Sequence, residues 1–147
     1  LLDGLSSVAA RVSRAALVVW TVFFSAYDSI QGIATGILTR YANDLAGAEQ
    51  AAVARAIDFV VEDSRLAGNI SAIGLVAGAS WLIVAIAAAV ALHKAGAGRA
   101  VVVATCLSVV VAAHMAPAAI GFVALFLAGV LRERERTKSA LGAPAVT

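Results

Sequence analysis

Hydrophobic residues fill three long stretches of this chain, and most charged residues lie between these stretches or flank them. A window of about 20 residues, the length that crosses the core of a bilayer, places the first two stretches over 15–39 and 70–93. The third begins at Ala100 and contains no Asp, Glu, Lys or Arg as far as Leu131. One straight helix over it would be roughly 48 Å long, against a hydrocarbon core of about 30 Å. The third stretch is therefore too long for a single span.

A polar break divides the third stretch at His114 to Pro117. Proline suits the first turn of a new helix and disfavours helix in the residue before it. The sequence therefore predicts two short spans, over 100–114 and 117–131. Each would be roughly 23 to 25 Å long, so local thinning of the bilayer is expected around them.

The basic residues favour four spans over three. With four spans, one side of the membrane receives most of the positive charge, and by the positive-inside rule that side is the cytoplasm. The residues concerned are Arg11, Arg14, Lys94, Arg99, Arg132, Arg134, Arg136 and Lys138. We therefore predict an all-α membrane protein in one domain, residues 1–147, with both termini cytoplasmic and a cytoplasmic tail over 132–147.

The segment 41–69 is predicted to lie outside the cytoplasm. Its apolar residues recur at helical spacing with charged residues between them, which predicts an amphipathic helix over about 49–66. Its acidic character argues against adsorption to anionic lipid. We expect this helix to cap the other helices or to dock on a partner.

Composition agrees with burial in lipid. The chain has 147 residues, of which 62% are hydrophobic and 14% charged. Its net charge of +2 is too small and too scattered to form a nucleic-acid-binding face. Arg11 and Arg14 before Ala15–Phe24 resemble a signal peptide, but the apolar stretch continues to Leu38, which favours a retained helix. The expected location is the cytoplasmic membrane of a bacterium, in multi-pass form.

Asp28 is the one ionisable residue near the centre of a predicted span. A carboxylate at that depth costs roughly 2.5 to 3.5 kcal/mol on insertion, so it is a functional hypothesis by default. Small and polar residues at steps of three and four place it on one face of the helix. They are Thr21, Ser25, Asp28, Gly32, Thr35 and Thr39. This face is expected to point into protein or water.

Other polar and aromatic residues are expected at a similar depth. They are Tyr27, Gln31, Ser80, Trp81 and Ser108. A carboxylate beside aromatic rings suits a cationic or protonated ligand. The alternative is that Asp28 is protonated and only helps helices to associate through a hydrogen bond.

Glycine pairs on the first two spans predict close helix packing. Gly32 and Gly36 form one pair, and Gly74 and Gly78 form the other. Packing within the chain is favoured over homodimerisation.

No catalytic, metal or nucleotide motif stands in the sequence, so we expect neither an enzyme nor a bound metal or cofactor. His93 ends its span on the cytoplasmic side and His114 lies at the turn on the opposite side, so one haem iron could not reach both. Cys106 lies in an apolar run and is expected to pack as a small hydrophobic residue.

Three motifs carry a family resemblance. They are Asp28-x-x-x-Gly32-x-x-Thr35-Gly36, His114-x-x-Pro117-x-x-x-Gly121-Phe122 and the run Arg132 to Arg136. With them the chain resembles uncharacterised small four-helix integral membrane proteins of GC-rich bacteria, and the resemblance implies the fold alone. The chain is also similar to small multidrug-resistance transporters, which have four short helices and an essential acid in the first. Those proteins have short loops and a glutamate at the place of Asp28.

The sequence favours an accessory or assembly subunit of a larger membrane complex, which would pack against other subunits or further copies of itself through its glycine faces. The alternative is a small cation- or proton-coupled transporter, with Asp28 as the titrating site and Tyr27 and Trp81 as walls. A sensor that couples the external helix to the basic tail is a third possibility. A single acid without a sequence repeat favours the first.

Overall fold

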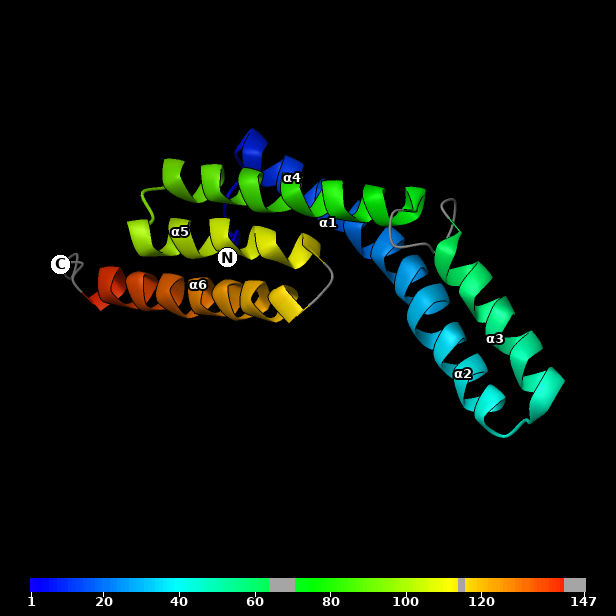
Figure 1. The fold of residues 1–147 in the computed structure, drawn as a ribbon. Coiled ribbons are helices and arrows are strands. Elements are labelled where there is room, and N and C mark those ends of the chain that lie inside the picture. The colour runs from blue at the N-terminus through cyan, green and yellow to red at the C-terminus, as the bar shows by residue number, and fades with distance from the viewer. Residues whose placement is uncertain (64–70, 114–115, 142–147) are drawn as a thin grey trace. The chain divides into compact units, whose positions relative to one another are not determined.

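The computed structural model describes residues 1–63, 71–113 and 116–141, and every regular element in these ranges is helical (Figure 1). The all-helical prediction is confirmed over this part of the chain. In chain order, the elements are α1 (Val8–Asp28), the π-helical η1 (Ser29–Ala34), α2 (Thr35–Asn43), α3 (Gly47–Glu62), α4 (Ala72–Lys94), α5 (Arg99–Leu107), the 3₁₀ segment η2 (Ser108–Ala113) and α6 (Ala116–Leu141).

Two helices are long and apolar enough to cross a membrane. The first is the continuous run of α1, η1 and α2, Val8–Asn43, with 36 residues, and the second is α4 with 23. Arg99–Val111 forms a shorter apolar helix. The first run contains the predicted span 15–39, and α4 covers the predicted span 70–93 from Ala72 onward. Ile70, the first residue of the predicted span 70–93, lies outside the described residues, as does His114, the last residue of the predicted span 100–114.

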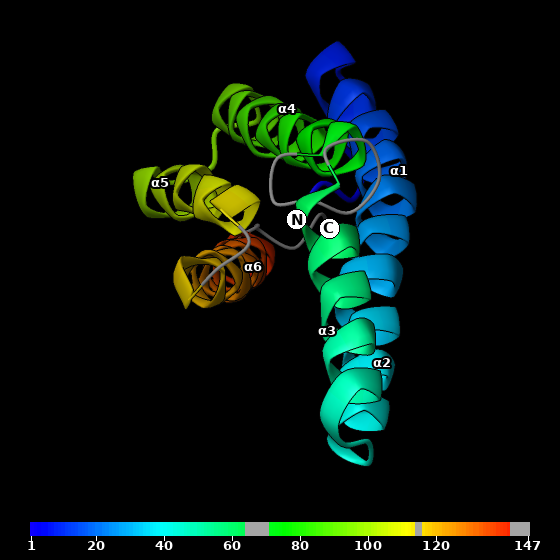
Figure 2. The ribbon, with the colours of Figure 1, turned by 45° about the vertical axis from the view of Figure 1, so that its right-hand side comes forward.

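Contacts divide the chain into two compact units. Unit 1 is Leu1–Leu17 with Trp81–Thr147, and unit 2 is Val18–Ser80. In unit 1, α5 and η2 pack along α6 as a helical hairpin (Figures 1 and 2). Gly121 allows the close approach, since a Cβ there would lie 2.7 Å from the backbone nitrogen of Val111. The third apolar stretch therefore forms two packed helical segments, with Pro117 in the first turn of α6.

The change from α5 to η2 lengthens a short helix. Nine α-helical residues and six 3₁₀ residues together rise about 25 Å, because a 3₁₀ residue rises about 2.0 Å and an α-helical residue about 1.5 Å. Side-chain hydroxyls bond back to the helix at the junction. Thr105 Oγ1 donates to the Val101 carbonyl at 2.8 Å, and Ser108 Oγ donates to the Thr105 carbonyl at 2.6 Å. Such bonds favour a local departure from α-helical geometry.

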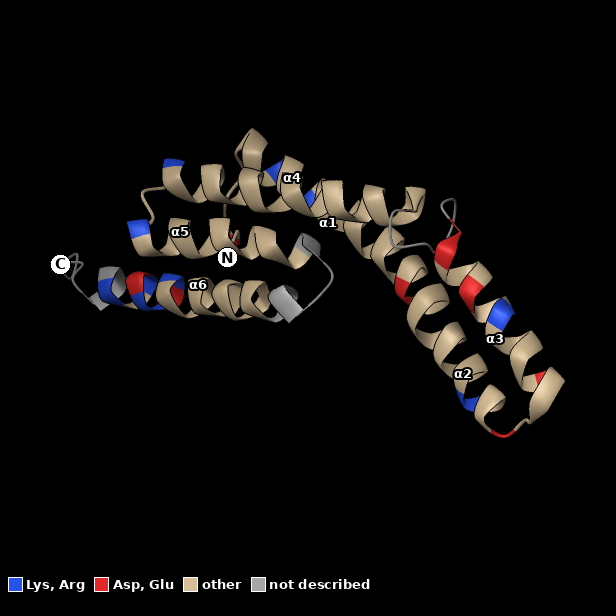
Figure 3. Cartoon of the chain, viewed as in Figure 1, with Lys and Arg blue, Asp and Glu red and all other residues tan. Residues whose placement is uncertain are grey.

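In unit 2, α2 and α3 lie side by side and are joined by a short turn (Figure 2). Gly47 begins α3 with a φ of +57°, a conformation that suits glycine because it has no Cβ. The amphipathic helix predicted over about 49–66 corresponds to α3, which ends at Glu62. Its charged residues lie along its length (Figure 3).

Three segments of unit 1 meet at one end, which we call the basic end. The backbone N–H of Gly98, between α4 and α5, donates to Glu135 Oε1 at 3.0 Å. Arg136 on α6 donates to the Asp3 carbonyl at 3.1 Å, and Arg14 donates to the carbonyl of Leu2 at 2.7 Å. Figure 3 shows basic residues, in blue, at the corresponding ends of α4, α5 and α6. The predicted tail 132–147 is helical as far as Leu141, and 142–147 lies outside the described residues.

Candidate functional site

Asp28 is the last residue of α1, and its side chain is exposed. The carboxylate lies over the glycine one turn later, since a Cβ on Gly32 would stand 3.1 Å from Asp28 Oδ1. It makes no capping hydrogen bond to the segment that follows. An acid in the middle of a long apolar helix therefore points away from the packed side of its own unit.

The π-helical segment η1 begins directly after Asp28. A π-helix widens the turn because its hydrogen bonds run from i to i+5, and such segments occur frequently at functional sites. Thr35 Oγ1 donates to the Gln31 carbonyl, and Thr39 Oγ1 donates to the Thr35 carbonyl at 2.8 Å. These bonds hold the hydroxyls against the helix backbone.

The wider turn changes which residues share a face with Asp28. Regular α-helical spacing predicts Thr35 on that face, and this expectation is wrong because Thr35 is only 9% exposed. Gly36 is exposed in its place. We call the resulting exposed surface the Asp28 face and define it by five residues. They are Thr21, Ser25, Asp28, Gly32 and Gly36.

The two glycines of this face touch no other helix among the described residues. A Cβ added at Gly36 would meet nothing within 4 Å, and one added at Gly32 would meet only Asp28. Within unit 2 this face is therefore uncovered, and the use of this glycine pair in packing within the chain stays a prediction.

Tyr27 points the other way and is buried, with 9% of its surface exposed. Its side chain shares a hydrogen bond with Gln31, one turn later. A Cβ on Gly74 of α4 would lie 3.2 Å from Tyr27 Cε2, so glycine at this position makes room for the ring. The Gly74 N–H also bonds to Ser71 Oγ at 3.1 Å. Tyr27 therefore packs α1 against α4, and Gly74 is a packing glycine.

Trp81 and Ser108 meet in unit 1. The ring of Trp81 is 3% exposed, and its Nε1 donates to the Ser108 carbonyl at 2.7 Å. The polar atom of the ring is thus used to join α4 to the start of η2. Ser80 is also buried and belongs to unit 2, as do Tyr27, Asp28 and Gln31, and Gly78 is half-buried in the same unit. Of the residues expected around a cationic ligand, the structure joins Tyr27 with Gln31 and Trp81 with Ser108.

Two polar contacts in unit 1 were not expected from the sequence. Ser13 is 2% exposed, and its Oγ donates to the Val84 carbonyl at 3.0 Å. Ala10 and Ala16, three residues away on either side, are also buried. This Ala-Ser-Ala spacing is a small-residue signal of the kind that lets helices approach closely. The second contact, from Gly98 to Glu135, has no comparable pattern because the residues are far apart in sequence.

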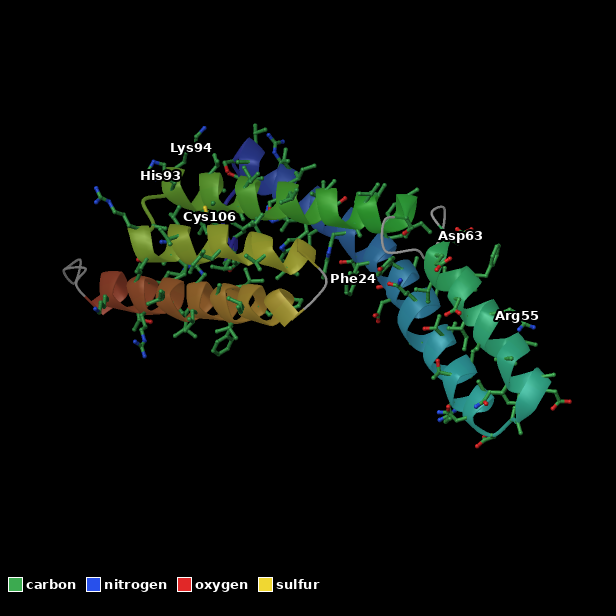
Figure 4. All side chains as sticks on the ribbon, viewed as in Figure 1. Phe24, Arg55, Asp63, His93, Lys94 and Cys106 are labelled. Carbon is green, nitrogen blue, oxygen red and sulfur yellow. The ribbon has the colours of Figure 1, made fainter. Side chains whose placement is uncertain are left out.

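Metal-binding residue types do not cluster within the described part of the chain, where no group of three or more His, Cys, Asp or Glu is placed to hold an ion. His93 lies exposed at the end of α4, and Cys106 is a free thiol on α5 (Figure 4). His114, the other histidine of the chain, lies outside the described residues.

Comparisons of this chain with family models, curated proteins and solved structures give no match.

Proposed function

We propose that this chain is a multi-pass protein of the cytoplasmic membrane, with four spans and both termini in the cytoplasm. The basic end supports this topology, because the N-terminal segment, the α4–α5 connection and the charged part of α6 are hydrogen-bonded there. Positive charge concentrated at one end of a set of apolar helices is the pattern of a cytoplasmic side. The lengthened α5–η2 helix and the hairpin with α6 support two short spans in the third apolar stretch.

The topology can be tested with reporter fusions. A reporter placed after Leu141 should be active only as a cytoplasmic fusion, and a reporter placed at Gly47 should be active only as an extracytoplasmic fusion. An extracytoplasmic result at Leu141 would rule out four spans.

We further propose that the protein is an accessory or assembly subunit of a larger membrane complex and docks through the Asp28 face. The observation that carries this proposal is the exposure of Asp28, Gly32 and Gly36 together on a helix long and apolar enough to cross a membrane. A carboxylate that faced lipid would cost several kcal/mol, whereas a protein neighbour can supply hydrogen-bond donors. Glycines one turn apart let another helix approach the backbone closely.

A heterologous partner fits this face better than a second copy. In a parallel pair of identical helices Asp28 would face another Asp28, and like charges at one depth repel each other. The basic residues of the same helical run, Arg11, Arg14 and Arg40, lie near its two ends. The partner is therefore expected to be a membrane helix that brings a hydroxyl, amide or cationic group to the depth of Asp28.

Purification in mild detergent or nanodiscs, followed by native mass spectrometry, tests the proposal. Wild type should carry a partner at fixed stoichiometry, and Gly36→Leu should lose it because the side chain blocks close approach. Ala15→Leu, an equal enlargement at an exposed position on the same helix, is the matched control and should keep the partner. Wild type alone as a monomer would contradict the subunit proposal.

The second candidate is a small cation- or proton-coupled transporter with Asp28 as the titrating site. The observation that favours it is the π-helical segment directly after an exposed acid. In that case the purified protein should be a homo-oligomer, and Asp28→Asn should abolish cation-driven uptake in proteoliposomes. Partner retention in native mass spectra distinguishes the two candidates.

A further inference from the structure

The hydrogen bonds at the end of η1 are displaced by one residue from those of an α-helix. In an α-helix the Thr35 N–H would bond to the Gln31 carbonyl, four residues earlier. Here it bonds to the carbonyls of Ile30 and Gly32, five and three residues earlier. The Gln31 carbonyl therefore loses the backbone donor that a regular helix would give it.

The Thr35 side chain supplies a donor in place of the backbone N–H. Its Oγ1 donates to the Gln31 carbonyl, and the side chain is buried, with 9% of its surface exposed. A carbonyl without a partner is costly in an apolar helix, because no water in the core of a bilayer can replace the lost donor. The Thr35 hydroxyl therefore stabilises the π-helical turn against return to an α-helix.

Thr39 makes the same type of bond without replacing a backbone bond. Its Oγ1 donates to the Thr35 carbonyl at 2.8 Å, also four residues earlier. Thr39 lies within α2, where the backbone N–H bonds to the same carbonyl. The Thr39 hydroxyl is therefore added to an α-helical bond, whereas the Thr35 hydroxyl takes the place of one.

The π-helical turn determines which residues of α2 continue the Asp28 face. Each residue of an α-helix advances the chain by about 100°, and a π-helical turn holds about one residue more than an α-helical turn. In the α-helical register Thr35 would lie beside Asp28, and Gly36 would lie about 100° further around the axis. In the observed register Thr35 is buried and Gly36 is exposed in its place.

We infer that Thr35 is a positioning residue, whose hydroxyl holds the Asp28 face in register by stabilising the π-helical turn. Return to the α-helical register would bring Thr35 into the face and turn Gly36 out of it. Docking of a partner at this face rests on the proposed function, whereas the control of the register by Thr35 does not.

The register can be measured as a distance within unit 2. The buried residues of α2 are Thr35 and Ala42, and α2 packs against α3, so α3 lies away from the Asp28 face. A change of register by about 100° would move α3, whose axis lies about 9 Å from that of α2, by about 14 Å. Spin labels at Thr21→Cys and Asp58→Cys, two exposed positions, report this movement in the isolated chain. The exposed thiol of Cys106 is removed by Cys106→Ala.

Three substitutions test the role of the hydroxyl. Thr35→Val keeps the branched shape but lacks the donor, and it should shorten the label distance by at least about 5 Å. Thr35→Ser keeps the donor and should preserve the wild-type distance. Thr39→Val is the matched control and should also preserve it. An unchanged distance in Thr35→Val, or an equal change in Thr39→Val, would overturn the inference.

Deletion of Ile33, an exposed residue of η1, separates a change of register from misfolding. It removes one residue from the wide turn, so the bond from the Thr35 N–H to the Ile30 carbonyl becomes an ordinary α-helical bond. Gly36 then lies beside Asp28 without a π-helical turn. Combined with Thr35→Val, the deletion should restore the wild-type label distance. Failure to restore it would overturn the control of the register by Thr35.

Partner retention in native mass spectra is measured on the same variants without spin labels. Thr35→Val should lose the partner, and the added deletion of Ile33 should restore it. If wild type carries no partner, the proposed function fails, while the label distances still decide the role of Thr35. If wild type carries a partner and the label distance ignores Thr35, only the present inference fails.

Discussion

The two helices that are long and apolar enough to cross a membrane differ in how much of their surface the chain covers. Over the most apolar window of Val8–Asn43, 11% of the residues are buried, whereas over that of Ala72–Lys94 the share is 56%. The more apolar of the two helices is therefore also the more buried one. More than half of the residues in the α4 window are buried, and most of those in the first window are not.

Residue size explains much of this difference. The buried side of α4 consists mainly of alanines, including Ala77, Ala85 and Ala88, which let other helices approach closely. In α1 the exposed residues include the larger Val18 and Val22, with 65% and 60% of their surface exposed. Large aliphatic residues suit contact with lipid, while the Asp28 face on the same helix does not. The first helix is thus divided between surfaces suited to lipid and to protein.

The largest expected effect comes from enlarging a residue on the covered helix. Ala85 is 2% exposed, so Ala85→Leu should lower the free energy of unfolding by about 3 kcal/mol through overpacking. Ala15→Leu, at an exposed position of α1, should change it little. Unfolding by SDS titration in mixed micelles measures both. Equal destabilisation would show that the two helices are covered to the same extent.

Removal of the Trp81 hydrogen bond is expected to have the next largest effect on the free energy of unfolding. Trp81→Phe keeps a ring in the buried position but leaves the Ser108 carbonyl without the Nε1 donor. Loss of this buried hydrogen bond should lower the free energy of unfolding by about 1 to 2 kcal/mol in the same titration. An unchanged value would mean that this bond contributes nothing to holding α4 against η2.

A smaller effect on the free energy of unfolding is expected when a serine is replaced by alanine, and the effect should differ between a buried serine and an exposed one. Ser13→Ala removes a buried bond to the Val84 carbonyl and should cost about 1 kcal/mol. Ser25→Ala, on the exposed Asp28 face, should stay within about 0.5 kcal/mol of wild type. Thermal unfolding of the two variants in one detergent gives the contrast. A cost at Ser25 as large as that at Ser13 would argue that the Asp28 face is covered within the chain.

The smallest effect is expected for Asp28→Asn in the isolated chain. The carboxylate is exposed, so its loss should change the free energy of unfolding by less than about 0.5 kcal/mol. Measured in the complex with a partner, the same substitution should matter more, because the face is then buried. A large change already in the isolated chain would place Asp28 in an internal contact.

The candidate site was predictable only in part. The sequence singled out Asp28 because an acid inside an apolar run is conspicuous, and it placed Tyr27 and Gln31 at a similar depth. It misplaced Thr35, since spacing rules assume a regular α-helix and carry no signal for a π-helical turn. The role of Gly74 beside Tyr27 depends on a contact between two helices, which glycine spacing alone does not locate.

The sequence by itself determined that the chain is helical, where its apolar helices lie and which acid stands within one of them. These properties depend on local composition and period, because helical hydrogen bonds are made within a few residues. The tertiary structure alone decided which apolar faces are covered and which charged residues of α6 bond within unit 1. Those outcomes depend on contacts between residues far apart in the chain, such as Ser13 with Val84 and Gly98 with Glu135, and no local pattern encodes them.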